Sequence, residues 1–172
     1  MFLVTDSLSN RETKIQKFLY RGEPAIAVLL AAADCERTMR RAILNLGTAP
    51  TSELAHRLGR PRPIGWLAPR PKPRKYGSTI DGYASAWVDE VYTWCGRALK
   101  DDVVTDWASL KKAFQLRHDL IHGDTGTTGL GYATKCVETL LRATRRVDEF
   151  ASAEGYDLTK RLKRRLKPRG SK

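Results

Sequence analysis

The sequence predicts an all-α protein, a bundle of four or five helices in one domain. Three observations lead to this prediction. Apolar residues recur at the three- and four-residue spacing of helices along several long segments, and no stretch follows the two-residue period of a half-buried strand. The chain has 172 residues, which is enough for a single sizeable core. Its hydrophobic fraction of 41% is typical of globular proteins.

The first third of the chain contains the strongest helix pattern. Residues 1–13 are polar and are expected to form a loose arm, followed by a short helix over 14–20. Pro24 suits the first turn of a helix and Gly47 suits a stop, so a long helix is predicted over 25–46. The residues predicted on its buried face are Val28, Ala32, Cys35, Met39, Ala42, Ile43 and Leu46, and those on another face are Asp34, Arg37, Arg41 and Asn45.

Glu36 and Arg40 lie near the border of that apolar face and are four residues apart. Side chains at this spacing are neighbours on a helix. We expect a surface ion pair between them, with a role in a polar site as the alternative.

Four later segments also carry apolar residues at helical spacing. In the second of them, the core is expected to include Trp87, Val91, Trp94, Cys95 and Leu99. The four predicted elements are a short helix from Thr51 or Ser52 to Leu58, a helix over 80–99, a helix capped by Thr105 or Asp106, and a helix over 132–153 that Gly155 ends.

Basic residues are concentrated in two segments. Six cations and five prolines occur within 59–77, where the prolines prevent regular helix or sheet, and eight cations occur within 160–172; neither segment contains an acid. Without these 14 cations, 17 basic residues remain against 19 acidic ones, so the two segments account for the net charge of +12. We therefore divide the chain into a helical domain at 1–155, with a Pro/Arg-rich inserted loop at 59–77, and a basic tail at 156–172.

This charge distribution predicts contact with a polyanion, with RNA as the first candidate and an acidic protein partner as the second. The alternative is a solubilising linker and a disordered tail. Trp66 lies among the loop cations, where it would either stack on a base or anchor the loop to the body. The loop cations predicted to bind RNA are Arg60, Arg62, Arg70, Lys72, Arg74 and Lys75.

The three cysteines are Cys35, Cys95 and Cys136, and they are far apart. This spacing indicates small core residues and argues against a disulfide framework or a zinc site. The sequence has neither a secretory signal pattern nor an apolar run long enough to span a membrane. We therefore expect a cytoplasmic protein without membrane contact, metal or cofactor.

The stretch from Leu116 to Gly123 contains two of the three histidines. Arg117 and His122 are five residues apart, which is about 140° around an ideal helix, so they would not share a face. Gly123 is expected to end the helix, which leaves His122 in the last turn or at the cap and lets the chain turn it toward Arg117. The apolar residues expected to hold this turn against the core are Leu116, Leu120 and Ile121.

An arginine beside histidines suits the cleavage of a phosphodiester. A guanidinium can clamp a phosphate through paired donors, and an imidazole can transfer protons near neutral pH. A helix C-terminus also favours the protonated imidazole. In RNA the 2′-hydroxyl can be the nucleophile, so no metal is required. Arg117 and His122 are therefore predicted to be catalytic, and His118 is a further candidate that would assist by hydrogen bonding or as a second proton-transfer group.

The run Arg117-His118-Asp119-Leu120-Ile121-His122 lies late in a helical domain and ahead of a final long helix. It resembles the Arg-x4-His motif of the HEPN superfamily, the helical-bundle ribonucleases of toxin–antitoxin, antiphage and CRISPR systems. The resemblance implies a metal-independent endoribonuclease, usually a homodimer with two motifs facing each other across one cleft, and held in check by an antitoxin or another regulatory protein.

The resemblance also implies that Arg117 and His122 are the principal catalytic pair. His118 takes a position where asparagine or aspartate is more usual. In the subgroup paired with a nucleotidyltransferase antitoxin, a tyrosine follows two residues after the motif histidine. This chain has Asp124 there, so regulation by nucleotide transfer is not expected.

Two other functions are compatible with the same residues. In the first, the basic segments bind nucleic acid or an acidic partner, and the motif is only structural. In the second, His118 and His122, four apart on one helical face, bind a metal ion for hydrolysis. The metal site is weakly supported, because Asp119 is too short for the usual base and the remaining histidine, His56, has no acidic pattern around it.

Overall fold

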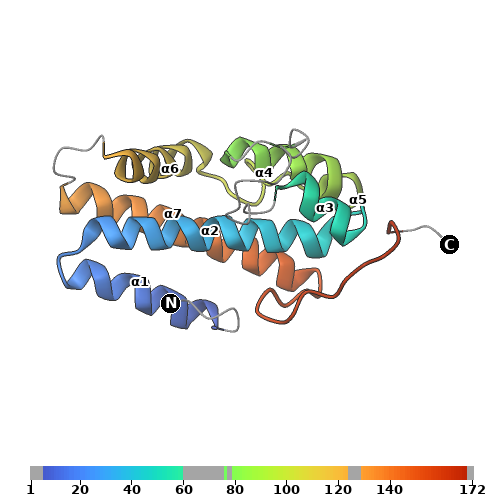
Figure 1. Ribbon diagram of the computed structural model, residues 1–172, viewed down its shortest axis with the longest axis horizontal. Coiled ribbons are helices and arrows are strands. Elements are labelled where there is room, and N and C mark those ends of the chain that lie inside the picture. Colours follow the sequence, from blue (N-terminus) through green and yellow to red (C-terminus); the bar gives the residue numbers. More distant parts are fainter. Residues whose placement is uncertain (1–5, 60–75, 77–78, 124–128, 170–172) are drawn as a thin grey trace, which may run out of the picture.

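The computed structural model describes residues 6–59, 76, 79–123 and 129–169, and within these ranges the chain is an all-α bundle without a strand, as predicted. Helices α2 and α7 lie side by side in the middle, with α1 on one side and α6 and α4 on the other (Figure 1). The helical elements are α1 (Leu8–Tyr20), α2 (Pro24–Leu46), α3 (Thr51–Arg57), α4 (Ile80–Trp87), a π-helix (Val88–Tyr92), α5 (Thr93–Cys95), α6 (Trp107–His122) and α7 (Leu130–Ala153).

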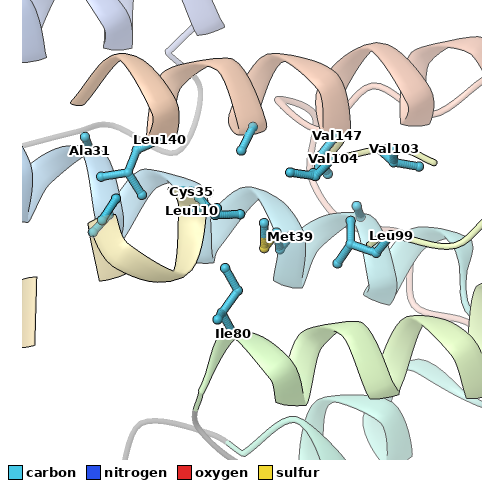
Figure 2. Close-up of a cluster of buried hydrophobic side chains, with 14 of the residues drawn as sticks. Ala31, Cys35, Met39, Ile80, Leu99, Val103, Val104, Leu110, Leu140 and Val147 are labelled. Atoms are coloured by element: carbon cyan, nitrogen blue, oxygen red, sulfur yellow. The ribbon is translucent and has the colours of Figure 1, made fainter. Parts of the chain in front are cut away.

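The core forms between α2 and its neighbours. All seven residues predicted on the buried face of α2 are buried. Figure 2 shows Cys35 and Met39 of α2 among side chains from other elements, such as Leu110 of α6 and Leu140 of α7. The helix ends at Gly47, where only a glycine fits. A Cβ at this position would lie 2.5 Å from a methyl carbon of Leu54 and 2.7 Å from the Ile43 carbonyl oxygen.

The prediction of a loose arm over 1–13 is wrong for residues 8–13, which are the first turns of α1. Ser7 caps this helix by accepting a hydrogen bond from the Asn10 amide at 3.3 Å. Arg11 is buried, and its Nε lies 2.8 Å from an oxygen of Asp34, which is also buried. The polarity of Arg11 and Asp34 suggested exposure, but each supplies the other's ionic partner inside the bundle.

The predicted helix over 80–99 ends early, at Cys95, and it changes type on the way. After Trp87 it widens into a π-helix, and Gly96 then takes a left-handed conformation with φ of 66°. The wider π turn rotates the residues that follow it relative to an ideal helix. As a result Trp94 is exposed and donates its indole N–H to the Leu46 carbonyl at 3.1 Å, while Leu99 is buried from an irregular segment.

Glu90, in the π-helix, is a buried carboxylate that joins three parts of the chain. It accepts hydrogen bonds from the Thr48 hydroxyl at 2.8 Å, from the Ala49 amide at 2.9 Å and from Arg57 at 2.6 Å. These contacts fix the corner between α2 and α3. Three partners satisfy a charge that would otherwise be costly to bury.

Residues 156–169 fold back onto this same corner. The Arg165 guanidinium donates to the carbonyls of Asn45 and Ala49, which lie at and beyond the C-terminal end of α2. The Arg165 main chain pairs with Thr51, which accepts from the Arg165 amide and so does not cap α3 as predicted. The Arg169 amide donates to the Thr48 carbonyl at 2.8 Å. The described part of the tail is therefore not disordered, and two of its arginines have structural roles.

The predictions about the cysteines and about membrane-spanning segments can be compared with the described residues. Cys35 and Cys136 are buried as predicted, Cys95 is half-buried, and burial raises the pKa of the Cys35 thiol to about 12. Within the described ranges, no helix combines the length and the apolar character that crossing a bilayer requires.

Candidate active site

Helix α6 positions the predicted catalytic residues. Its N-terminus is capped by Asp106, one of the two predicted caps, which accepts from the Ser109 amide at 3.1 Å. Its C-terminus is closed by Gly123, whose φ of 74° favours glycine and whose amide donates to the Asp119 carbonyl. His122 therefore lies in the last helical turn, as expected.

The two motif histidines form a pair on one face of α6. Their ring centroids are 4.3 Å apart with an interplanar angle of 50°. Both side chains are exposed, and neither ring makes a hydrogen bond to any described residue. Two imidazoles are therefore available to exchange protons with a bound substrate.

Arg117 and His118 line a cavity of about 410 Å³ between α6, α2 and the start of α4. Leu116 is buried beneath this region and Leu120 packs against the core, but Ile121 is exposed and does not hold the turn as predicted. His122 is not among the lining residues and adjoins the cavity through the ring of His118. The residues that line the cavity are Glu36, Thr79, Ile80, Asp81, Lys111, Phe114, Gln115, Arg117 and His118.

Glu36 is the functional candidate that the sequence did not assign to the site. Its Oε2 lies 3.9 Å from Nη2 of Arg117, close enough for attraction but beyond hydrogen-bond distance. Arg117 makes no side-chain hydrogen bond to a described residue, so its donors remain open to a ligand. The one signal in the sequence was the position of Glu36 on the border of the apolar face of α2. Arg40, its expected partner, donates instead to the carbonyls of Ala55, Leu58 and Gly59.

Burial raises the pKa of Glu36, and the nearby Arg117 guanidinium partly offsets this effect. A carboxyl whose folded-state pKa exceeds its unfolded value stabilises the fold below the unfolded pKa and loses that contribution as the pH rises. At neutral pH the ionised Glu36 is therefore held at a cost in stability. Such a cost is common at functional sites, where a charged group serves binding or catalysis although it lowers the stability of the fold.

The variant Glu36→Gln should therefore be more stable than the wild type at neutral pH. We expect its melting temperature to be about 1–3 °C higher at about pH 7, because the amide removes the cost of a partly buried charge. The gain should shrink at about pH 4, where the wild-type carboxyl is itself protonated. Thermal unfolding of both proteins at the two pH values measures this, and equal melting temperatures at neutral pH would contradict it.

The other predicted site residues lie elsewhere. Arg60, Arg62, Arg70, Lys72, Arg74, Lys75 and Trp66 are outside the described residues. Asp119 accepts from Gln115 at 2.6 Å, and His56 is exposed on α3. Across the ranges that the structure describes, no group of three or more histidine, cysteine, aspartate or glutamate side chains is arranged to hold a metal ion.

The C-terminal part of α6 thus presents a guanidinium and two imidazoles, and α2 adds the partly buried carboxylate of Glu36 beside the guanidinium. These groups can bind an anion and move protons around it. No protein-family model, curated protein or solved structure matches this chain.

Proposed function

We propose that this chain is a metal-independent, HEPN-type endoribonuclease that acts as a toxin or antiphage-defence effector. The observation that supports this most is the shared cavity of Arg117 and His118, with the His122 ring 4.3 Å from that of His118. Arg117 and His122 are the two defining residues of the Arg-x4-His motif, and His118 lies between them. The groups that RNA cleavage needs are therefore close to one another at the motif on which the family resemblance rests.

In the proposed reaction, Arg117 binds the scissile phosphate and stabilises the charge of the phosphorane-like transition state. His122 accepts the proton of the 2′-hydroxyl, whose oxygen attacks phosphorus. The bond from phosphorus to the 5′-oxygen then breaks, and His118 in its protonated form gives a proton to that oxygen. The products are a 2′,3′-cyclic phosphate and a 5′-hydroxyl, so the atoms and charges balance without a metal or a cofactor.

A homodimer is part of the proposal. The end of the bundle that carries His122 is formed by the C-termini of α1 and α6 and the N-termini of α2 and α7 (Figure 1). A second copy could cover apolar side chains there and bring two motifs together, as in the family. The large apolar residues exposed at this end are Tyr20, Ile26, Ile121, Leu130 and Tyr132.

RNA would be gathered by the cations of the inserted loop, whose two flanks are both fixed to the body. On one side Arg40 binds the Leu58 and Gly59 carbonyls. On the other, Tyr76 is buried and donates its hydroxyl to Asp89 at 2.8 Å. Asp89 lies in the π-helix that directly follows α4, and Ile80, the first residue of α4, lines the candidate site. Binding through such cations falls steeply with added salt.

RNA cleavage in the presence of EDTA tests the proposed function directly. The proteins to compare are the wild type, His122→Ala, His118→Ala and, as a matched control, His56→Ala, which removes an exposed histidine on α3. We expect the wild type and His56→Ala to leave 2′,3′-cyclic phosphate ends. The His122→Ala variant lacks a proton-transfer group, so its rate of RNA cleavage is expected to be about 100- to 10,000-fold lower than that of the wild type.

Three results would contradict the proposal. Activity that requires added metal would favour the His118–His122 metal site, and cleavage by His122→Ala at the wild-type rate would show that His122 has no role in the reaction. If every protein binds RNA but none cleaves it, a non-catalytic binding module would be favoured. The assay is run with each protein alone and with a cell extract added as a source of an activator.

A further inference from the structure

A second cavity of about 410 Å³ lies where the tail folds back, at the ends of α2 and α7. In Figure 1 this region, at the start of the red C-terminal segment, is on the opposite side of α2 and α7 from α6 and α4. No residue lines both this cavity and the candidate active site. The lining residues are Asn45, Gly155, Tyr156, Asp157, Lys160, Arg161, Lys163, Arg164 and Arg165.

The segment that forms one wall of this cavity is attached to the helical body at several points. Leu158 is buried in the core, and Arg41 donates to the Lys160 carbonyl. At the far end, the Thr51 amide donates to the Arg165 carbonyl at 3.0 Å, and the Arg165 amide donates to the Thr51 hydroxyl at 2.9 Å. The segment between Leu158 and Arg165 is thus fixed at both ends, and its exposed basic side chains Arg161, Lys163 and Arg164 line the cavity.

The charges that line the cavity are not neutralised from within. Asp157 is the one acidic lining residue, and its carboxylate already accepts from the Thr159 amide and hydroxyl and lies 3.4 Å from the Lys160 ammonium. The Arg165 guanidinium is directed to the Asn45 and Ala49 carbonyls. Within the described residues, no acidic side chain pairs with the three cations Arg161, Lys163 and Arg164.

We propose that this cavity binds phosphate groups of an oligophosphate chain, at a site separate from the candidate active site. Guanidinium and ammonium groups bind phosphate oxygens through short, charge-assisted hydrogen bonds. The volume falls within the range of about 300–1,000 Å³ that small-molecule sites occupy, so the cavity can take several phosphates at once. The phosphates can come from the backbone of an RNA strand or from a free nucleotide-like oligophosphate. The inference does not depend on cleavage at Arg117.

The test compares two variants of equal net charge. The first, the cavity variant, replaces Arg161, Lys163 and Arg164 with glutamine. The control also introduces three glutamines, in place of the exposed lysines Lys17 on α1, Lys112 on α6 and Lys135 on α7. The probes are inorganic tripolyphosphate and a 2′-O-methyl oligonucleotide, which lacks the nucleophilic hydroxyl. Titration calorimetry at about 0.15 M salt measures binding, and thermal unfolding establishes that both variants are folded.

We expect the cavity variant to lose about tenfold or more in affinity for at least one probe, while the control stays within about threefold of the wild type. Loss for tripolyphosphate alone identifies a free oligophosphate as the ligand, and loss for the oligonucleotide alone identifies an RNA backbone. Tripolyphosphate should also raise the melting temperature of the wild type more than that of the cavity variant. Equal losses in the two variants, or no binding of either probe by the wild type, would overturn the proposal.

Discussion

Replacing Arg117 with alanine is expected to slow RNA cleavage by about 100- to 1,000-fold, the usual cost of removing one group that stabilises transition-state charge. The Arg117 guanidinium lines the cavity with His118 and has donors open to a ligand, so we expect it to act on the phosphate itself. Arg117→Lys keeps the charge but loses the paired donors, and its rate should lie between the other two. Single-turnover cleavage in EDTA measures all three rates.

The control for this experiment is Arg142→Ala, which removes an exposed arginine from α7, away from the lining of the cavity. It should cleave RNA within about twofold of the wild-type rate, since exposed substitutions away from a site have small effects. If Arg117→Ala cleaves as fast as Arg142→Ala, Arg117 has no role in the reaction. The proposed mechanism would then be wrong even if the protein cuts RNA.

Replacing Arg11 with alanine is expected to lower the free energy of unfolding by about 3–5 kcal/mol. The side chains of Arg11 and Asp34 are 4% and 1% exposed, and their closest atoms are 2.8 Å apart. The alanine variant leaves the Asp34 carboxylate buried without its main partner, and the free energy of desolvating that charge is then uncompensated. Urea unfolding at neutral pH measures the loss.

The double variant Arg11→Met/Asp34→Ala should recover most of that loss, because it removes the buried charge together with its partner. The surface pair Arg146–Glu149, whose side chains are 64% and 63% exposed, provides the control. Removing Arg146 should cost less than about 1 kcal/mol. Similar costs for Arg11→Ala and Arg146→Ala would show that the buried pair does not matter to stability.

The helices that could be predicted from the sequence are those whose pattern is local. The buried face of α2, the cap of α6 at Asp106 and its end at Gly123 each depend on residues within a few positions of one another. The widening of the helix after Trp87 has no such local signal. A π-helical turn contains more residues than an α-helical turn, so Trp94 no longer lies on the buried face. The apolar spacing in the sequence gives no sign of this change.

The features that could not be predicted depend on partners distant in the chain. Arg11 is buried because Asp34 on the next helix faces it, and residues 156–169 lie against the body because Arg165 donates to carbonyls at the end of α2. Glu36 joins the candidate site through Arg117, on a different helix. The polarity of a residue indicates how often such a residue is exposed. It does not indicate which charged residue of another helix will lie next to it in the fold.

The anchoring of Gly59 and Tyr76 bears on how this protein can change over evolutionary time. Both flanks of the Pro/Arg-rich segment hold fixed positions on the body, through Arg40 on one side and Asp89 on the other. For a loop whose two ends are held, doubling the number of residues between them changes the closure free energy by only about 0.6 kcal/mol. Insertions, deletions and new cations between these two anchors therefore cost the bundle little. Evolution can therefore change the residues between the two anchors while the helices that carry Arg117 and His118 stay the same.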